Sequence, residues 1–380
     1  MVARPGSCIV HPNPRCATAA RTSLELFTET GDRLAAAYAK TLLAVEAIAG
    51  TDRAGSLQML DEAGAEFDRA GDDWGRALVL FVRMELHFLT GHTDTATGYA
   101  EHALGLFRAL QDHWGISAIQ YHHALALHGA GRLEEALSVH EAALAEGRIG
   151  LTNTVQYALA DMGHIALQLA DLDRATQHFA EAHDVARQLG AEASARAAVG
   201  EGHLARHRAN LEAAIERYQT ALRLLTGQGT PEWEAATLTG LGFAAELTGD
   251  LDTAEAYHRS AWQAAAQAVP AGARAGATAL EGLACVAVTR GSAHRAANLL
   301  GTAARWRQWH HQPALRTEQH DINRAAAAAA DILGEDSYRT AYTHGLQPPP
   351  GAVVDLQHPV ERQLAAWLAA PTPRPPAVPR

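Results

Sequence analysis

Histidine is the residue type that could take the most chemical roles in this sequence, and it occurs 21 times among 380 residues. His203 and His207 lie four residues apart, so on a helix both imidazoles would face the same way and could share one metal ion. A third ligand is not fixed by the spacing, because His-Glu-x-x-His does not occur and Cys8, Cys16 and Cys285 do not cluster. We therefore interpret most histidines as polar or packed side chains and predict no metal site.

No other group of residues points to catalysis. Glu134 and Glu135 are adjacent carboxylates at an expected helix start, where they favour the positive end of the helix dipole. A phosphate-binding Gly-x-x-x-x-Gly-Lys-Ser/Thr loop is absent, and the only lysine, Lys40, lacks the glycines. The sequence favours a protein that is not an enzyme and that carries no cofactor.

The totals restrict the partners and the compartment. A formal charge of −11 argues against the basic surface that direct nucleic-acid binding requires. No apolar run approaches the roughly 20 residues of a membrane span, and the N-terminus lacks the apolar core of a signal peptide. Three scattered cysteines fit a reducing compartment. We expect a cytoplasmic chain with neither a nucleic-acid nor a membrane partner.

The elements that position these side chains follow a repeat. Residues 131–144, Gly-Arg-Leu-Glu-Glu-Ala-Leu-Ser-Val-His-Glu-Ala-Ala-Leu, contain an alanine that recurs in the same frame with steps of 40, 39, 39, 40 and 42 residues. Such a period predicts stacked helix pairs. The recurring alanines are Ala96, Ala136, Ala175, Ala214, Ala254 and Ala296.

Two helices fit into each period. The expected pairs are 72–90 with 93–110, 113–129 with 133–146, 152–169 with 172–189, 191–207 with 211–225, 232–248 with 251–268, and 273–289 with 293–310. Two further helices are expected at 317–333 and 334–345. Asp32, Asp72 and Asp112 recur one 40-residue step apart and should cap helix starts. Trp74 and Trp114 share that frame, which favours a packing wedge between repeats over an aromatic platform for a ligand.

Small and large residues alternate in a fixed way within the repeat. Twelve residues before each recurring alanine from Ala136 onward stands a small residue, and four residues after it stands a larger one. The small residues are Ala124, Gly163, Gly202, Gly242 and Ala284, and the larger ones are His140, Phe179, Tyr218, His258 and Leu300. This pattern resembles the tetratricopeptide repeat, although its usual period is 34. The resemblance implies an all-α, right-handed superhelical array of antiparallel helix pairs, an α-solenoid, with a helical C-terminal cap.

A narrower resemblance covers residues 17–357. Gly-Asp-Asp-Trp-Gly at 71–75, Ala-Leu-Glu-Gly-Leu-Ala at 279–284, Leu-Leu-Gly-Thr-Ala-Ala-Arg at 299–305 and Leu-Gly-Glu-Asp-Ser-Tyr at 333–338 are similar to the C-terminal repeat region of bacterial transcriptional activators of the ATP-binding LuxR-type and antibiotic-regulator class. Without a phosphate loop, and with 23 proline-rich residues after 357, the chain would keep their sensing and docking part alone.

Four segments are expected. Residues 1–15 would be a disordered leader. Residues 16–311 would form the repeat array, a partial first repeat plus six to seven helix pairs with a period of about 40. Residues 312–357 would form a helical capping segment that covers the last apolar face. Residues 358–380 would be a short helix and a proline-rich tail.

The resemblance also implies a binding groove. In tetratricopeptide arrays the first helix of each pair lines the concave face, and transfer by position gives aromatic, hydrogen-bonding and charged side chains suited to a peptide or a small anionic ligand. Histidines there would make binding depend on pH between about 5 and 8. The predicted groove residues are Tyr121, His122, Leu125, His128, Tyr157, Asp161, His164, Gln168, Arg196, His203, Arg206, Phe243 and Glu246.

The leading functional hypothesis is a non-catalytic regulatory module that binds a peptide, a protein segment or a small signalling ligand in this groove. The alternative is an enzyme or metal-dependent protein that uses the histidine-rich inner face. A third hypothesis is self-association through the face left by the incomplete first repeat.

Overall fold

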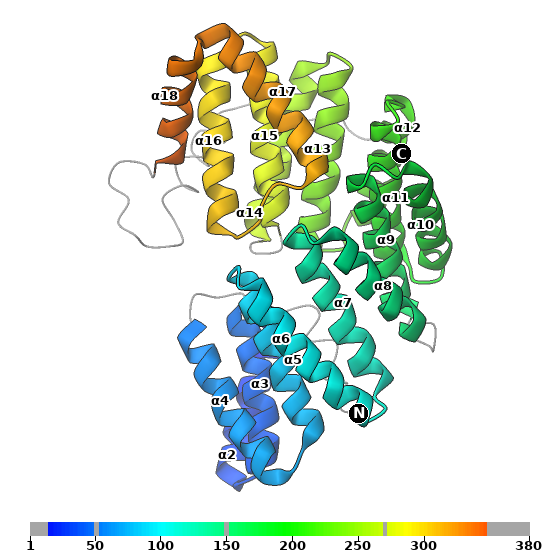
Figure 1. Ribbon diagram of the computed structural model, residues 1–380, viewed down its shortest axis with the longest axis vertical. Helices are drawn as coiled ribbons and strands as arrows, with labels where there is room; N and C mark the ends of the chain where they lie inside the picture. Colours follow the sequence, from blue (N-terminus) through cyan, green and yellow to red (C-terminus); the bar gives the residue numbers. More distant parts are fainter. Residues whose placement is uncertain (1–13, 49–52, 148–151, 269–271, 348–380) are drawn as a thin grey trace. The chain divides into compact units, whose positions relative to one another are not determined.

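The computed structural model describes residues 14–48, 53–147, 152–268 and 272–347. Within these ranges the regular structure consists of seventeen helices and contains no strand (Figure 1). Successive helices pack against each other in pairs, which confirms the predicted all-α array of helix pairs. The expected leader up to residue 13 and all of the expected chain from 348 to 380, including the short helix and tail, lie outside the described residues.

The contacts divide the chain into two units, Met1–Ala158 and Leu159–Arg380. The boundary falls within one helix, α9 (Thr152–Gln168). The other helices described in the first unit are α2 (Pro14–Thr30), α3 (Arg33–Ile48), α4 (Arg53–Ala70), α5 (Asp73–Leu89), α6 (Thr93–Ala109), α7 (His113–Gly129) and α8 (Leu133–Gly147).

The second unit contains four further helix pairs and two C-terminal helices. The pairs are formed by α10 (Leu172–Ala186) after α9, α11 (Ala191–His207) with α12 (Leu211–Leu225), α13 (Pro231–Leu247) with α14 (Leu251–Gln267), and α15 (Ala273–Thr289) with α16 (Ala293–Trp309). The last two helices of the described residues are α17 (Arg316–Leu333) and α18 (Glu335–Leu346).

Helices α5 and α7 begin directly after the predicted aspartates, Asp72 and Asp112. Asp72 accepts a hydrogen bond from the amide of Gly75 at 2.9 Å, and Asp112 does the same for Gly115, so each carboxylate satisfies a free amide of the first turn. The preceding turn contains Gly71, whose positive φ of 67° ends α4 in a left-handed conformation that suits glycine. The capping prediction is confirmed.

The same aspartates link neighbouring pairs. The Trp74 indole donates to the second carboxylate oxygen of Asp112 at 2.6 Å, and the Tyr38 hydroxyl donates to Asp72 at 2.6 Å. The Trp74 and Trp114 rings stack with centroids 6.2 Å apart. The tryptophans are therefore packing wedges between repeats, as predicted.

The core of the second unit is built from large side chains that lie between two glycines. Tyr218 is fully buried, and its ring packs against Gly202 of the preceding helix and Gly240 of the next pair. A Cβ atom at position 202 would lie 2.6 Å from a ring carbon of Tyr218. Phe179 lies in the same way between Gly163 and Gly200, and His258 between Gly242 and Gly282.

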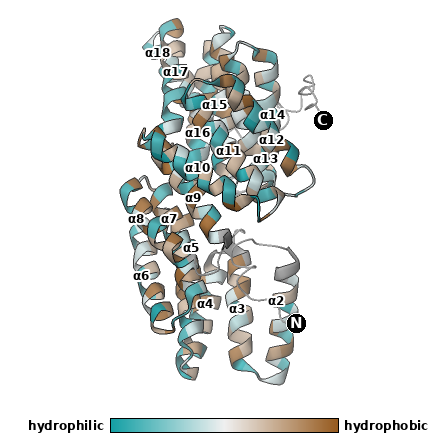
Figure 2. Cartoon of the chain, turned by 90° about the vertical axis from the view of Figure 1, so that its right-hand side faces the viewer, coloured by the Kyte–Doolittle hydropathy of each residue, from teal (hydrophilic) through white to brown (hydrophobic). Residues whose placement is uncertain are grey.

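Polar and apolar residues share most helices, so each helix has a buried and a solvated face (Figure 2). None of the helices in the described part of the chain combines the length and the apolar character that crossing a membrane would need.

Candidate functional site

The predicted groove residues fall into two groups, one in each unit. The first-unit group lies on α7 and the start of α9 and consists of Tyr121, His122, Leu125, His128 and Tyr157. The second-unit group lies on α9, α11 and α13 and consists of Asp161, His164, Gln168, Arg196, His203, Arg206, Phe243 and Glu246.

Three residues of the first group come together. The Tyr121 ring lies 5.8 Å from the Tyr157 ring and 5.4 Å from the His122 ring, centroid to centroid. The Nδ1 atom of His122 lies 2.7 Å from a carboxylate oxygen of Glu85 on α5. Leu125 is half-buried. These contacts hold the aromatic side chains of α7 in place.

His164 and His203 form an aromatic cluster in the second unit. Their rings are 5.6 Å apart, and Nδ1 of His203 is hydrogen-bonded to the Tyr218 hydroxyl at 2.8 Å. Burial lowers the pKa of His164 to about 4 and holds the pKa of His203 well below its ordinary value. The expected titration between pH 5 and 8 is therefore wrong for His164, because desolvation keeps its imidazole neutral throughout that range.

Arg196 lies beside this cluster on α11. Its guanidinium is 4.4 Å from the centroid of the Trp233 ring, in a cation–π arrangement. Gln168 and Arg196 are buried, and Asp161 is half-buried. The aromatic and charged residues at this end of the unit are thus packed against one another.

The remaining residues, Arg206, Phe243 and Glu246, face another part of the same chain, the C-terminal helix α17. Arg206 lies 5.1 Å from the Phe243 ring centroid and donates to Asp321 of α17 at 2.8 Å. Glu246 receives two hydrogen bonds from Arg324 of α17, at 2.8 and 2.7 Å. We call Arg206, Phe243, Glu246 and Cys285 the α17-binding face.

Asp321 is the centre of this contact. It accepts from Arg206 and, at 3.1 Å, from Arg324, and its backbone carbonyl accepts from the Cys285 thiol with a sulfur–oxygen distance of 3.7 Å. Burial opposes its ionisation, but the two arginines outweigh burial and keep the pKa of the Asp321 carboxyl below its usual range. A charged carboxylate is therefore stable here while both arginines are present.

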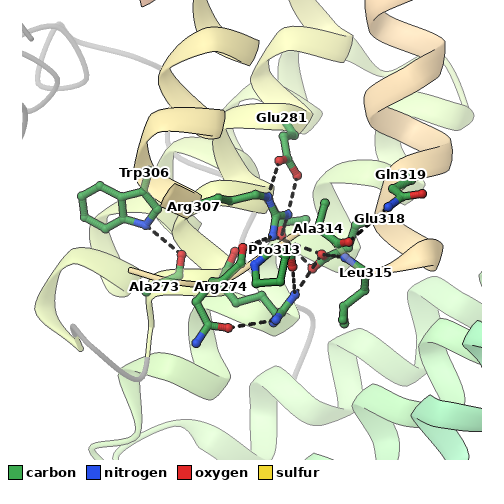
Figure 3. A network of polar contacts seen from close by, with 12 residues as sticks. Ala273, Arg274, Glu281, Trp306, Arg307, Pro313, Ala314, Leu315, Glu318 and Gln319 are labelled. Atoms are coloured by element: carbon green, nitrogen blue, oxygen red, sulfur yellow. Dashed lines mark hydrogen bonds and ion pairs between the residues drawn. The ribbon is translucent and has the colours of Figure 1, made fainter. Parts of the chain in front are cut away.

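The start of α17 is fixed by a second polar network (Figure 3). Arg307 on α16 donates to both oxygens of Glu281 on α15, at 2.7 and 2.9 Å, and lies 3.1 Å from Glu318 on α17. Glu318 also pairs with Arg274 at 3.0 Å and accepts from the amide of Leu315 at 2.7 Å. Burial raises the pKa of the Glu281 carboxyl, while the bonds from Arg307 oppose that rise.

Sequence reasoning missed the α17 side of these contacts. Glu318, Asp321 and Arg324 are spaced by three residues and therefore share one face of an otherwise alanine-rich helix, which is the available signal. This spacing does not identify the residues that the α17 side chains contact, because Asp321 pairs with a residue 115 positions away and Arg324 with one 78 positions away.

The histidine-rich inner face bears on the alternative hypothesis of a metal-dependent protein. Within residues 14–48, 53–147, 152–268 and 272–347, no three His, Cys, Asp or Glu side chains converge in a way that could hold a metal ion. His203 uses Nδ1 for Tyr218, and its neighbour one turn on, His207, is exposed.

No protein family model matches the sequence, and no curated protein matches it. Among solved structures, the chain is similar to a Signal Transduction ATPase with Numerous Domains protein with a tetratricopeptide repeat sensor from Pyrococcus horikoshii, with a TM-score of 0.54 and 17% identity over 75% of this chain and 43% of that one. A tetratricopeptide repeat protein from Parabacteroides merdae matches with a TM-score of 0.48 and 14% identity over 88% of this chain and all of that one. NprR in complex with its cognate peptide NprX matches with a TM-score of 0.48 and 14% identity over 96% of each chain.

The first of these likenesses shows that the chain has a tetratricopeptide repeat fold. The chain spans less than half of the length of that protein.

Proposed function

Starting from a tetratricopeptide repeat fold, we propose that this chain is a non-catalytic regulatory module that binds a peptide or a protein segment on the α17-binding face. The observation that supports the proposal is the pairing of Arg206 and Glu246 with a helix. A surface that already holds one polypeptide segment through the half-buried cation Arg206 and the buried carboxylate Glu246 has the chemistry to hold another.

The face is arranged before any ligand arrives. Arg206 lies over the Phe243 ring, which limits the orientations of its guanidinium, and its Nη1 atom donates to Asp321. Glu246 has a side chain that is 4% exposed, so its carboxylate needs a cationic partner from whatever segment covers it. A ligand must therefore supply a carboxylate for Arg206 and a guanidinium or ammonium for Glu246.

Peptide-library screening of the full chain, followed by titration calorimetry on the peptides that bind, tests this proposal. Arg206→Ala and Glu246→Gln should each weaken binding about tenfold or more, the equivalent of about 1.4 kcal/mol. Arg217→Ala removes an exposed arginine from α12 and should leave affinity unchanged. Unchanged affinity of both face variants for every peptide found would refute the assignment of the face.

A further inference from the structure

One face of α17 carries all of its ionic contacts. Glu318, Asp321 and Arg324 lie one helical turn apart, and each forms at least one ion pair with a residue of the repeat helices. The partners come from three different helices, α11, α13 and α15, as well as from α16 through Arg307. The helix runs across α13, α15 and α16 in Figure 1.

The apolar part of this contact joins α17 to the core of the second unit, against which Ile322, Ala326, Ala328 and Leu333 are packed partly buried. Only Asp321, Ala325 and Ala329 of α17 are buried, whereas thirteen residues of α15 are buried. Each buried alanine contributes little apolar area, and the partly buried side chains add the rest of the hydrophobic contact. Buried ion pairs roughly balance their desolvation cost and contribute specificity more than net stability. The ion pairs therefore determine which helical segment fits this face.

From these contacts we propose that α17 is an intramolecular ligand of the α17-binding face, and that an external helical segment with the same charge pattern exchanges with it. The pattern is an acidic residue followed three positions later by an arginine, as in Asp321 and Arg324. The inference rests on the proposed function, because exchange matters only if the face also receives an external segment.

The geometry explains why this pattern is selected. Residues three apart share one helix face, and Arg206 and Glu246 stand on neighbouring first helices, α11 and α13, that contact each other. A segment with the two charges reversed would bring a cation to Arg206 and an anion to Glu246. Like charges beside Arg206 and Glu246, whose side chains are 15% and 4% exposed, reject such a segment.

Tethering makes α17 an effective competitor even if its contacts are weak. A segment joined to its site by a short connection has an effective concentration in the millimolar range. The connection between α16 and α17 is short, because α16 ends at Trp309 and α17 begins at Arg316. The apparent affinity for an external segment is therefore reduced by the fraction of molecules in which α17 occupies the face.

A labelled peptide with the sequence of Arg316–Leu333 is the probe, titrated into the full chain and followed by fluorescence anisotropy. The full chain with Asp321→Ala and Arg324→Ala in its own α17 should bind the peptide about tenfold more tightly than the wild type, because its resident helix is weakened. Hydrogen exchange should show faster exchange in α17 and unchanged exchange in α15.

The matched control carries Glu335→Ala and Arg339→Ala, which removes an exposed i,i+4 ion pair from α18. It should bind the peptide as the wild type does. A peptide with Asp321→Arg should not bind the Asp321→Ala, Arg324→Ala chain. The same peptide should bind a chain that carries Arg206→Glu, because the ion pair between positions 206 and 321 is then restored with its charges exchanged.

Two results would overturn the inference. One is equal binding of the peptide by the wild type and the Asp321→Ala, Arg324→Ala chain, and the other is unchanged exchange of the α17 amides in that chain. If that chain fails to fold, the single change Arg324→Gln replaces it in both measurements. If the chain binds the α17 peptide but no peptide from the library, the exchange is supported and the proposed function is refuted. If the chain binds peptides from the library but not the α17 peptide, the proposed function is supported and the exchange is refuted.

Discussion

Gly202 shows what a single hydrogen in place of a side chain does in this molecule. The Tyr218 ring packs directly against its Cα, and Gly240 receives the same ring from the other side. The ring is fully buried, so it has no free space to move into. The closeness of α11, α12 and α13 therefore depends on these two positions.

Replacement of Gly202 by alanine should destabilise the second unit by about 1–3 kcal/mol, because the added methyl overlaps a buried ring. The matched control is Gly98→Ala on α6, where nothing lies within 4 Å of the added Cβ. That change should stabilise α6 by about 0.5–1 kcal/mol, because glycine has a lower helix propensity than alanine. Urea denaturation followed by circular dichroism measures both, and a neutral Gly202→Ala would contradict the packing argument.

At the scale of elements, the buried pair Glu281 and Arg307 joins α15 to α16 beneath the start of α17. Their side chains are 4% and 7% exposed, so removal of Arg307 leaves the Glu281 carboxyl buried without its cationic partner, whereas removal of Glu281 leaves Arg307 paired with Glu318. Arg307→Ala should cost about 3–5 kcal/mol, and Glu281→Ala should cost less, because Arg307 keeps Glu318 as a partner. The combined change Glu281→Leu and Arg307→Met should cost much less than the sum of the two, which a double-mutant cycle by urea denaturation would measure.

The exposed pair Asp184 and Arg187 on α10 and the following turn is the control for this cycle. Both side chains are more than half exposed, so solvent screens their attraction and its loss should cost less than about 1 kcal/mol. Equal losses at the buried and the exposed pair would mean that burial does not govern the energy of these ion pairs.

The helices themselves were predictable from local signals. The ranges 113–129, 191–207, 211–225 and 273–289 are found with the bounds that the spacing predicts, because capping residues and glycines mark their ends. The helices α3 and α4 were not assigned, because the recurring alanine frame begins only at Ala96. Local rules thus define helices where the repeat is regular.

The occupant of the predicted groove was not predictable in the same way. The spacing of the small residues placed Arg206, Phe243 and Glu246 on one set of first helices, and the structure brings these three together. Whether α17 covers them depends on the direction in which the chain leaves α16, which no residue pattern encodes. Long-range ion pairs such as Arg206 with Asp321 follow from that direction.

At the scale of the whole molecule, buried histidines make folding sensitive to mild acid. Burial lowers the pKa of His140 in the first unit and His258 in the second to about 3, and that of His164 to about 4. These groups stay neutral when folded but take up protons when unfolded below about pH 6.5. Acid therefore favours the unfolded state, and stability is full above pH 6.5 and decreases as the pH falls toward the folded pKa values.

Thermal denaturation should accordingly shift to lower temperature between pH 7 and pH 5. Each such histidine contributes about 2 kcal/mol of lost stability at pH 5, from about 1.4 kcal/mol for each pH unit below its unfolded pKa. His258→Phe should make the second unit less sensitive to pH, because Phe179 shows that a phenyl ring fits between two glycines. His102→Phe, at an exposed position, should keep the wild-type dependence, and a melting temperature independent of pH in the wild type would contradict the argument.

The rings that lie between two glycines also constrain how such a chain can evolve. Tyr218 packs against a glycine of its own repeat and a glycine of the next, so duplication or deletion of one complete period presents each ring with an equivalent glycine. A rearrangement of any other length would leave a ring facing a side chain. The array can lengthen or shorten only by whole periods, and substitutions at the three positions of each contact should be inherited together.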